Sequence, residues 1–223
     1  MTKGKSYRRL LSLLFIAGIL IFAAATLTLG IISEDIIDHR PLNAADVQFS
    51  NWLYAHHSPS LRRAMFVATS LGSTATVTCV AVGLGLYLLW RRRLAWLSVL
   101  GASLGGGMLL NRLLKYAFHR PRPHFDDPIL TLTSYSFPSG HTMAATALYG
   151  VIAAYLLSRT SNWSWRLIII FVAATLIALV AFSRIYLGAH YLTDVLAAMA
   201  EGFAWLSLSL TMVYSIRSKA TLC

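Results

Sequence analysis

Residues 137–157 read FPSGHTMAATALYGVIAAYLL, a short polar motif that runs directly into a long apolar segment. On its other side, the motif Phe137–His141 follows a loop rich in basic residues. Two further polar clusters stand beside apolar runs in the same way: residues 115–123 (KYAFHRPRP) and residues 183–194 (SRIYLGAHYLTD). Because each neighbouring apolar run is long enough to cross a bilayer, the three clusters are predicted to meet at one membrane face.

The composition places the chain in a lipid bilayer. Its 223 residues are 57% hydrophobic and only 12% charged, far more apolar than a soluble domain of this size. The formal net charge of +11 is compatible with nucleic acid binding, but most basic residues flank apolar runs. Segments this apolar have no place in a nucleic-acid-binding domain, so we exclude that class and predict an integral membrane protein.

A helix needs about 20 apolar residues to cross the hydrocarbon core with its backbone polar groups paired. Six segments meet this requirement, the fourth and fifth only if they extend into the motifs beside them. The segments are Leu10–Ile32, Val67–Trp90, Leu94–Leu114, Thr142–Leu157, Leu167–Phe182 and Val195–Tyr214. The predicted fold is all-α, a six-helix transmembrane bundle that forms a single domain over residues 1–223, with a motif core at about residues 115–194.

The first segment follows Lys3, Lys5, Arg8 and Arg9, and so resembles a secretory signal. It is longer than the apolar core of such a signal, and the sequence after it does not read as a soluble mature domain. We therefore expect Leu10–Ile32 to remain in the protein as an uncleaved transmembrane span.

Basic residues in short loops indicate orientation, because they favour the cytoplasmic side. With six spans, most of them fall on one side: Lys3, Lys5, Arg8, Arg9, Arg91, Arg92, Arg93, Arg159, Arg166, Arg217 and Lys219. We therefore expect both termini in the cytoplasm, and the three polar clusters and the loop of residues 33–66 on the outer face. The polar clusters nevertheless carry basic residues onto that outer face, which suggests a function for them: Lys115, Arg120, Arg122 and Arg184.

The Phe137–His141 motif has the composition of a helix start. Ser139 is a good N-cap, because a serine hydroxyl accepts from amide groups that lack partners in the first turn. The same amide groups and the positive end of the helix dipole attract anions, and Gly140 lets a phosphate approach the backbone. These residues are consistent with both a structural cap and a phosphate site.

His190 and Asp194 are four residues apart, a spacing that places both on one face of a helix. A carboxylate bonded to one imidazole nitrogen fixes the tautomer and leaves the other nitrogen free to act as a nucleophile. A proton relay and a purely structural pair are the alternatives. Arg184, at a neighbouring helix end, suits a forked bond to phosphate oxygens.

Lys115 and Arg122 add positive charge to the same face. Phosphoryl transfer spreads negative charge over three oxygens, so cations and oriented amide groups stabilise its transition state. Pro121 and Pro123 stiffen the backbone on either side of Arg122. Taken alone, the two cations are equally compatible with the binding of lipid headgroups.

Together, the three clusters resemble the signature of the type 2 phosphatidic acid phosphatase family. The matching residues are Lys115 with Arg122-Pro123, Pro138-Ser139-Gly140-His141, and Ser183-Arg184 with His190 and Asp194. The resemblance implies that His190 is a nucleophile forming a phosphohistidine, that Asp194 orients it, and that His141 protonates the leaving group. It further implies hydrolysis without a metal or other cofactor, and a set of phosphate-binding residues: Lys115, Arg122, Ser139, Gly140 and Arg184.

Other polar residues receive no catalytic role. The outer loop of residues 115–140 also carries His119, His124, Asp126 and Asp127. Their spacing fits no familiar metal site, so we expect a solvated loop. Glu201 in the last span is expected to face the bundle interior, because a charge that faces lipid is costly. For residues 33–66 we expect a short interfacial helix, either an anchor or a lid for lipid entry.

The predicted activity is hydrolysis of a lipid phosphate or diphosphate at the outer face of a bacterial inner membrane. The resemblance favours undecaprenyl diphosphate and phosphatidylglycerol phosphate as substrates over phosphatidic acid. The alternatives are a phosphotransferase of the same family, a phosphatase for soluble esters, and a non-enzymatic carrier of lipids or anions. A carrier needs cations but no nucleophile with an orienting carboxylate, so His190 and Asp194 argue against it.

Overall fold

The structure, a computed structural model, describes residues 41–130 and 132–220, together with scattered positions between residues 20 and 34. The predicted span Leu10–Ile32 lies outside the described residues, apart from those scattered positions. Every regular element in the described part is a helix. In chain order these are α2 (Pro41–Ala55), α3 (Pro59–Ser70), α4 (Thr74–Trp90), α5 (Leu94–Gly101), η1 (Ala102–Gly106), α6 (Gly107–Phe118), α7 (Gly140–Leu157), α8 (Trp163–Tyr186) and α9 (Leu192–Ala220).

Within the described residues, five segments are long and apolar enough to cross a membrane. They are Pro59–Trp90, Leu94–Phe118, Gly140–Leu157, Trp163–Tyr186 and Leu192–Val213. These segments correspond to the second to sixth predicted spans, and they make the chain an all-helical membrane protein. The short fourth and fifth spans extend into their motifs as expected, because α7 begins at Gly140 and α8 continues past Arg184.

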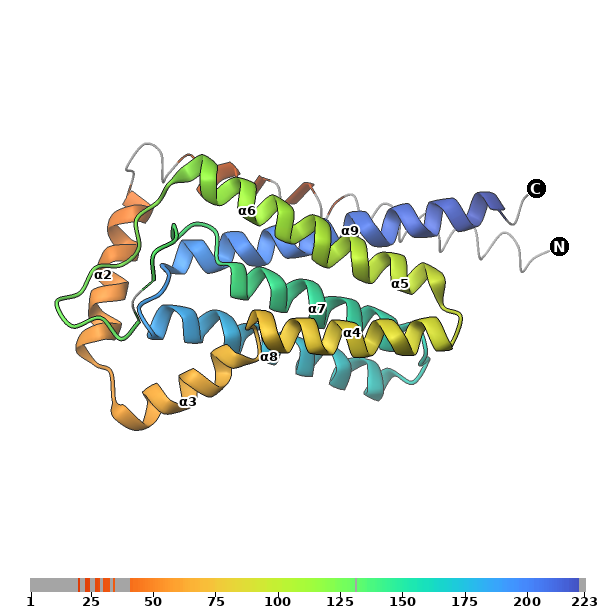
Figure 1. The fold of residues 1–223 in the computed structure, drawn as a ribbon, viewed down its shortest axis with the longest axis horizontal. Helices are drawn as coiled ribbons and strands as arrows, with labels where there is room; N and C mark the ends of the chain where they lie inside the picture. Colours follow the sequence, from red (N-terminus) through yellow and green to blue (C-terminus); the bar gives the residue numbers. More distant parts are fainter. Residues whose placement is uncertain are drawn as a thin grey trace.

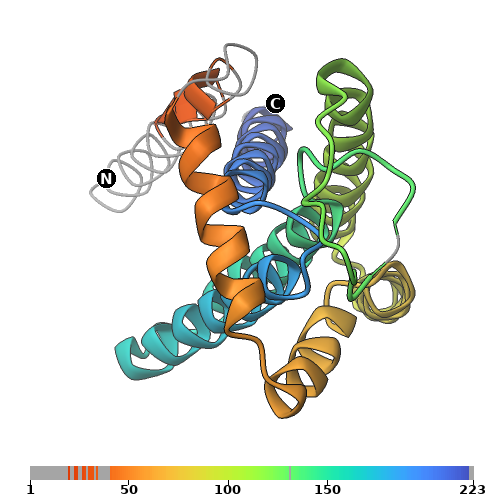
Figure 2. The ribbon, with the colours of Figure 1, turned by 90° about the vertical axis from the view of Figure 1, so that its left-hand side faces the viewer.

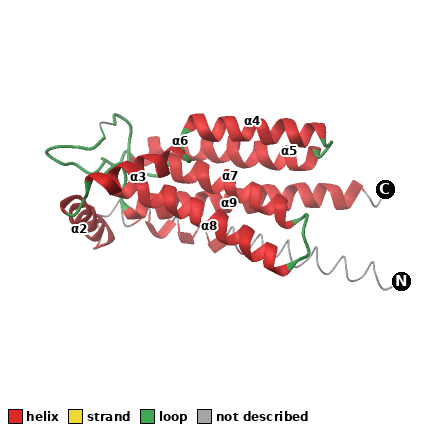
Figure 3. Cartoon of the chain, turned by 90° about the horizontal axis from the view of Figure 1, so that it is seen from below, coloured by secondary structure: helices red, strands yellow, loops and turns green. Residues whose placement is uncertain are grey.

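The long helices form an elongated bundle, and the loops gather at its two ends (Figures 1 and 3). α7 is the central helix and packs mainly against α8 and α9. Small residues such as Ala144, Ala145 and Ala147 let the neighbouring helices approach it on all sides, and all three are buried. The start of α7, where the Phe137–His141 motif lies, is at the same end of the bundle as α2 (Figure 1).

α2 lies crosswise over that end of the bundle (Figure 2). Its inner side is buried and includes Asp46, Ser50 and Leu53, whereas Trp52 on its outer side is exposed. An exposed aromatic residue agrees with the interfacial helix predicted for residues 33–66. That prediction is nevertheless incomplete, because α2 also directs a buried carboxylate toward the ends of the long helices.

A break at Leu71–Ser73 separates α3 from α4. The Ser73 hydroxyl caps α4 by accepting from the Thr76 amide at 3.2 Å. Tyr149 on α7 donates to the Leu71 carbonyl at 2.9 Å, which holds the break against the central helix. The predicted span Val67–Trp90 is therefore not one continuous helix, because its residues 67–70 belong to α3. The apolar run continues through the break, so hydropathy does not reveal it.

The third span contains a π-helical turn, η1, between α5 and α6. The Trp205 indole on α9 donates to the Ala102 carbonyl in this turn at 2.5 Å, and its ring lies against Gly106. Gly106 thus permits close packing between this span and α9. Gly101 and Gly105, by contrast, face open space.

Close packing between α7 and α9 gives a testable expectation for stability. A methyl group added at Gly202 would lie 2.8 Å from Thr146 Cβ, so Gly202→Ala should lower the free energy of unfolding by about 1–3 kcal/mol. Gly83 is a matched control in α4, because an added methyl group there meets nothing within 4 Å. Thermal unfolding in detergent should show a lower midpoint for Gly202→Ala only. Equal midpoints for the two variants would contradict the packing.

Candidate active site

The Phe137–His141 motif forms the start of α7 as predicted. Ser139 is the N-cap, and its buried hydroxyl accepts from the Thr142 amide at 3.5 Å. The Ser139 amide donates to the Asp194 carbonyl at 3.2 Å and so ties this helix start to the first turn of α9. Gly140 and His141 follow as the first helical residues, whose amide groups point out of the helix end. This end of α7 has the geometry of an anion site.

The turn between α8 and α9 carries His190. The Arg184 carbonyl accepts from the Ala189 and His190 amides at 3.0 and 3.2 Å. Gly188 has a left-handed φ of 67°, which residues with side chains disfavour. α9 begins two residues after His190. The prediction that His190 and Asp194 share one face of a helix was therefore wrong, because only Asp194 belongs to the helix.

Asp194 is fully buried in the first turn of α9 and is surrounded by donors. The Tyr191 amide donates to Oδ2 at 3.0 Å, and the Ser136 hydroxyl donates to the same oxygen. Arg120 Nη1 donates to Oδ1 at 2.6 Å. His190 Nδ1 lies 3.4 Å from Oδ2. The turn thus brings the carboxylate and the imidazole together although the two residues do not share a helix.

Burial lowers the pKa of His190 to about 3, against the opposing effect of Asp194. The imidazole is therefore neutral at neutral pH. Its Nε2 lies 3.3 Å from Arg122 Nη1, and a guanidinium group only donates. A neutral ring with a carboxylate at Nδ1 and a guanidinium at Nε2 carries its proton on Nδ1 and its lone pair on Nε2. That lone pair faces the cations of the site.

Lys115 and Arg122 both bind the segment that leads into the Phe137–His141 motif. Lys115 Nζ donates to the Tyr135 carbonyl at 2.9 Å. Arg122 donates to the Ser134 carbonyl at 2.7 Å and to the Ser134 hydroxyl at 2.9 Å. It also donates to the Ala189 carbonyl at 2.5 Å, beside His190. The two cations therefore connect the first and second clusters, and Arg122 reaches the third.

Arg184 and His141 lie in the same site as His190, Lys115 and Arg122. Arg184 is buried at the end of α8, and its Nη1 donates to the Thr69 hydroxyl at 2.8 Å. Its Nε is also buried and meets no hydrogen-bond partner among the described residues. His141 is half-buried and lies within electrostatic reach of Arg184, Arg122 and Lys115. The structure thus brings residues of all three clusters into one site.

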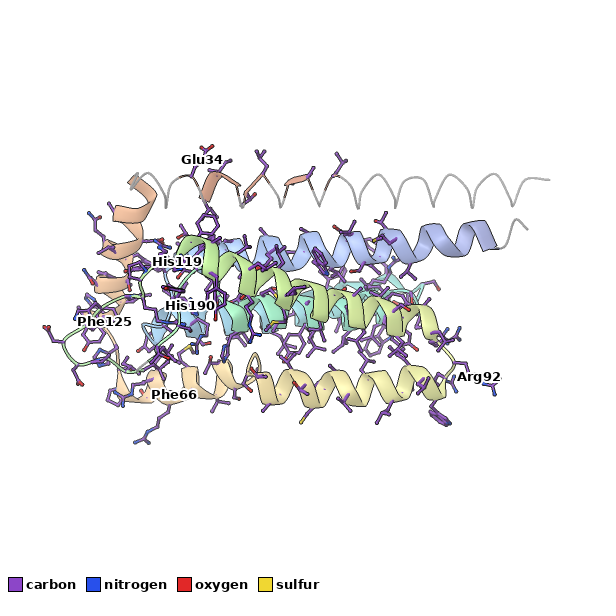
Figure 4. The ribbon with its side chains drawn as sticks, turned by 45° about the horizontal axis from the view of Figure 1, so that its top comes forward. Glu34, Phe66, Arg92, His119, Phe125 and His190 are labelled. Atoms are coloured by element: carbon purple, nitrogen blue, oxygen red, sulfur yellow. The ribbon has the colours of Figure 1, made fainter. Side chains whose placement is uncertain are left out.

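Figure 4 places this site at one end of the bundle. His119, Phe125 and His190 lie at that end, and Arg92 lies at the opposite end. The three polar clusters therefore share one end of the long helices, as the sequence predicted. The basic turn of residues 91–93 is at the other end.

Two buried residues of the site were assigned no specific role from the sequence. Arg120 was noted only as a basic residue on the disfavoured face, yet it contacts Asp194 directly. Asp46 of α2 forms an ion pair with Arg120 at 2.9 Å. Arg120 could have been assigned to the site from the sequence, because a basic residue on the face opposite the basic loops is unusual. Asp46 could not, because its hydrogen-bond partners are more than 70 residues away in the chain.

The expectation for Glu201 is confirmed. Glu201 faces the bundle interior with 1% of its surface exposed, and Asn111 Nδ2 donates to its Oε2 at 2.8 Å. His119 ends α6 in a left-handed conformation with a φ of 47°. In the part of the chain that the structure describes, no group of three His, Cys, Asp or Glu residues is placed to hold a metal ion.

A membrane bundle that gathers cations and a helix start around a neutral histidine has the architecture of a membrane-embedded phosphatase. Comparison with known proteins agrees. The family model of the PAP2 superfamily matches residues 96–218. The chain belongs to the PAP2 superfamily, which confirms the resemblance drawn from the three motifs.

Individual relatives extend this likeness over most of the chain. A phosphatidylglycerophosphatase B of Bacillus subtilis is 34% identical over 163 residues, which cover 72% of this chain and 79% of that protein. The undecaprenyl-diphosphatase BcrC of the same organism is 29% identical over 156 residues, which cover 65% of this chain and 71% of that protein. A crystal structure of a transmembrane PAP2-type phosphatidylglycerolphosphate phosphatase from Bacillus subtilis has a TM-score of 0.75 at 30% identity, covering 89% of this chain and 96% of that one.

The low pKa of His190 predicts how stability depends on pH. Between a folded pKa of about 3 and an unfolded pKa of about 6.5, the unfolded chain binds more protons. The free energy of unfolding should therefore fall as the pH is lowered through this window, by up to about 1.4 kcal/mol per pH unit from His190 alone.

A thermal unfolding series in detergent tests this expectation. His190→Gln lacks the titrating group, so its midpoint should fall less steeply than that of the wild type between about pH 6.5 and pH 4. The difference between the two slopes isolates His190 from the other titrating residues. Parallel curves would mean that His190 is not held neutral.

Proposed function

We propose that this protein is a membrane lipid phosphatase that hydrolyses a lipid phosphate or diphosphate through a phosphohistidine at His190. The observation that carries the proposal is the arrangement around this ring, with Asp194 at Nδ1 and Arg122 at Nε2. A lone pair on Nε2 beside a guanidinium is placed to attack a phosphorus atom whose oxygens that guanidinium binds.

Two adjacent cavities support a lipid as the substrate. A cavity of about 940 Å³ has a lining that includes Lys115 and other polar residues. A second, of about 560 Å³, runs between α4 and the α5–η1–α6 segment and has an apolar lining that includes Val77 and Leu104. Gly140 lines both cavities, and His141 lines the second. A phosphate group fits the polar part, and a hydrocarbon chain fits the apolar part.

In the first proposed step, His190 Nε2 attacks the phosphorus atom while the bond to the leaving oxygen breaks. His141, in its protonated form, donates a proton to that oxygen, so that an alcohol or a phosphate leaves. Lys115, Arg122 and Arg184 bind the oxygens on which negative charge accumulates, together with the amide groups at the start of α7 that Ser139 and Gly140 form.

In the second proposed step, a water molecule attacks the phosphohistidine and the phosphorus–nitrogen bond breaks. The neutral His141 takes a proton from that water, so inorganic phosphate leaves and both histidines return to their starting forms. Asp194 keeps the Nδ1 proton of His190 in place throughout. The two steps use side chains and backbone amide groups, and require no metal ion.

The substrates we favour are undecaprenyl diphosphate and phosphatidylglycerol phosphate, ahead of phosphatidic acid. Relatives named as a phosphatidylglycerophosphatase and as an undecaprenyl-diphosphatase support this order. Each of the three lipids joins a phosphate or diphosphate to long hydrocarbon chains. That division matches the polar and apolar parts of the two cavities.

We place the protein in a bacterial inner membrane with both termini in the cytoplasm and the site on the outer face. The support is the charge distribution along the bundle. The turn of residues 91–93 carries three arginines at the end opposite His190. Such basic turns favour the cytoplasmic side.

Phosphate release by the purified protein in detergent tests the activity. The panel contains undecaprenyl diphosphate, phosphatidylglycerol phosphate, phosphatidic acid and a soluble ester, all with a chelator present. We expect the wild type to release phosphate from the lipids and His190→Ala to lose at least about 10⁴-fold in rate, since loss of a nucleophile removes the reaction path. Appreciable release by folded His190→Ala would identify a different nucleophile.

The same assay separates the alternatives. Loss of activity in chelator, with recovery on addition of a divalent cation, would contradict a metal-independent reaction. Labelled phosphate that appears on a second lipid would favour a phosphotransferase. Equal turnover of the soluble ester would favour a phosphatase for soluble substrates. Lipid translocation that survives His190→Ala would favour a carrier.

Thiol labelling in intact cells tests the orientation. The background is Cys79→Ser/Cys223→Ser. Asp126→Cys places a thiol at an exposed position next to Phe125, which lies at the end that carries the site, and Arg92→Cys places one at the other end. A membrane-impermeant maleimide should label Asp126→Cys in intact cells and Arg92→Cys only after lysis. The opposite pattern would place the site in the cytoplasm.

A further inference from the structure

A second carboxylate lies behind Asp194. Asp46 of α2 has a side chain that is only 2% exposed. Its Oδ1 accepts from the Thr193 amide at 3.1 Å. Its Oδ2 accepts from the Thr193 hydroxyl, and from Arg120 Nη2 at 2.9 Å. The Asp46 carboxylate therefore binds both the backbone amide and the side-chain hydroxyl of Thr193, the residue immediately before Asp194.

Arg120 bridges the two carboxylates. Its Nη2 donates to Asp46, while its Nη1 donates to Asp194 Oδ1 at 2.6 Å and to the Thr193 hydroxyl at 2.8 Å. The guanidinium also lies over the Tyr191 ring, 4.3 Å from its centre. Burial opposes the charge of Arg120, but Asp194 and Asp46 outweigh it and raise its pKa. One guanidinium thus holds three residues of the turn that begins α9.

The start of α9 depends on this arrangement. The first amide groups of a helix need acceptors, which the N-cap side chain usually supplies. Tyr191 precedes α9 and has no suitable acceptor, so Asp46 supplies one from a different helix. Its negative charge also suits the positive end of the helix dipole. α2, which lies across the end of the bundle, therefore caps the helix that carries Asp194 (Figure 2).

We propose that Asp46 and Arg120 are positioning residues for hydrolysis at this site. They fix the first turn of α9, and thereby fix the Asp194 carboxylate that faces His190 Nδ1. The orientation of the ring then keeps Nε2 toward the bound phosphate. Neither residue contacts the substrate. This inference rests on the proposed function, because it assigns a second carboxylate to the support of the same nucleophile.

Asp46→Asn tests the inference with little change in shape. The amide cannot accept from all three donors, and its NH₂ group competes with Arg120 for the same acceptors. We expect kcat to fall on the order of 10-fold to 100-fold, the usual effect of a small displacement behind a reacting group. The KM, and the inhibition constant of inorganic phosphate, should stay within about threefold, because the phosphate-binding cations are untouched.

The matched control is Asp126→Asn, the same chemical change at an exposed residue of the outer loop. It should retain the kinetic constants of the wild type. Arg120→Lys and Arg120→Gln form a second pair. Lysine keeps the positive charge but cannot span two carboxylates, so Arg120→Lys should retain more of kcat than Arg120→Gln. A role in folding alone would not separate kcat from KM in this way.

The number of phosphate-binding sites per molecule identifies misfolding. A variant that is merely unfolded loses bound phosphate and kcat in the same proportion, and that result would overturn the positioning role. A kcat for Asp46→Asn within about twofold of the Asp126→Asn control would overturn it too. If the wild type itself shows no His190-dependent release, the proposed function fails and this inference fails with it.

Discussion

A buried carboxylate in a membrane protein must be matched by donors, and the Asp194 carboxylate imposes that requirement on the whole site. Its two oxygens are served by Arg120, Ser136 and the Tyr191 amide, and it faces His190. These partners come from separate parts of the chain, so meeting the requirement brings the loops and helix ends together. Loss of one partner of a buried ion pair typically costs about 3–5 kcal/mol, enough to disturb the arrangement.

The same requirement explains why charge collects at the end of the bundle. Cations on the loop between α6 and α7, together with the start of α7, place donors at the end of the apolar helices. A neutral histidine between them avoids the cost of another buried charge. Next to the donors, an apolar groove runs along the helices, and Gly101 and Gly105 leave room in its wall. A phosphate and a hydrocarbon chain can therefore be accommodated side by side.

Much of this organisation was predictable because it depends on local sequence. Long apolar runs located five spans of the described part, Ser139 was identified as an N-cap, and Glu201 was assigned to the interior. The break at Leu71–Ser73 was not predictable, since hydropathy is continuous across it and the break is held by a contact from α7. The position of His190 was also misjudged, because four-residue spacing fits a helix as well as the turn that precedes one.

The sequence by itself determined that the chain is a helical membrane protein, which three motifs would share one end, and which family the motifs resemble. Apolar length and short-range spacing carry that information, because both act between residues close in the chain. Only the tertiary structure decided that α2 crosses the bundle end and that Asp46 caps α9. That contact joins residues 147 positions apart. The energy of this contact depends on burial and on Arg120, which binds both Asp46 and Asp194. Neither can be read from the order of residues in the sequence.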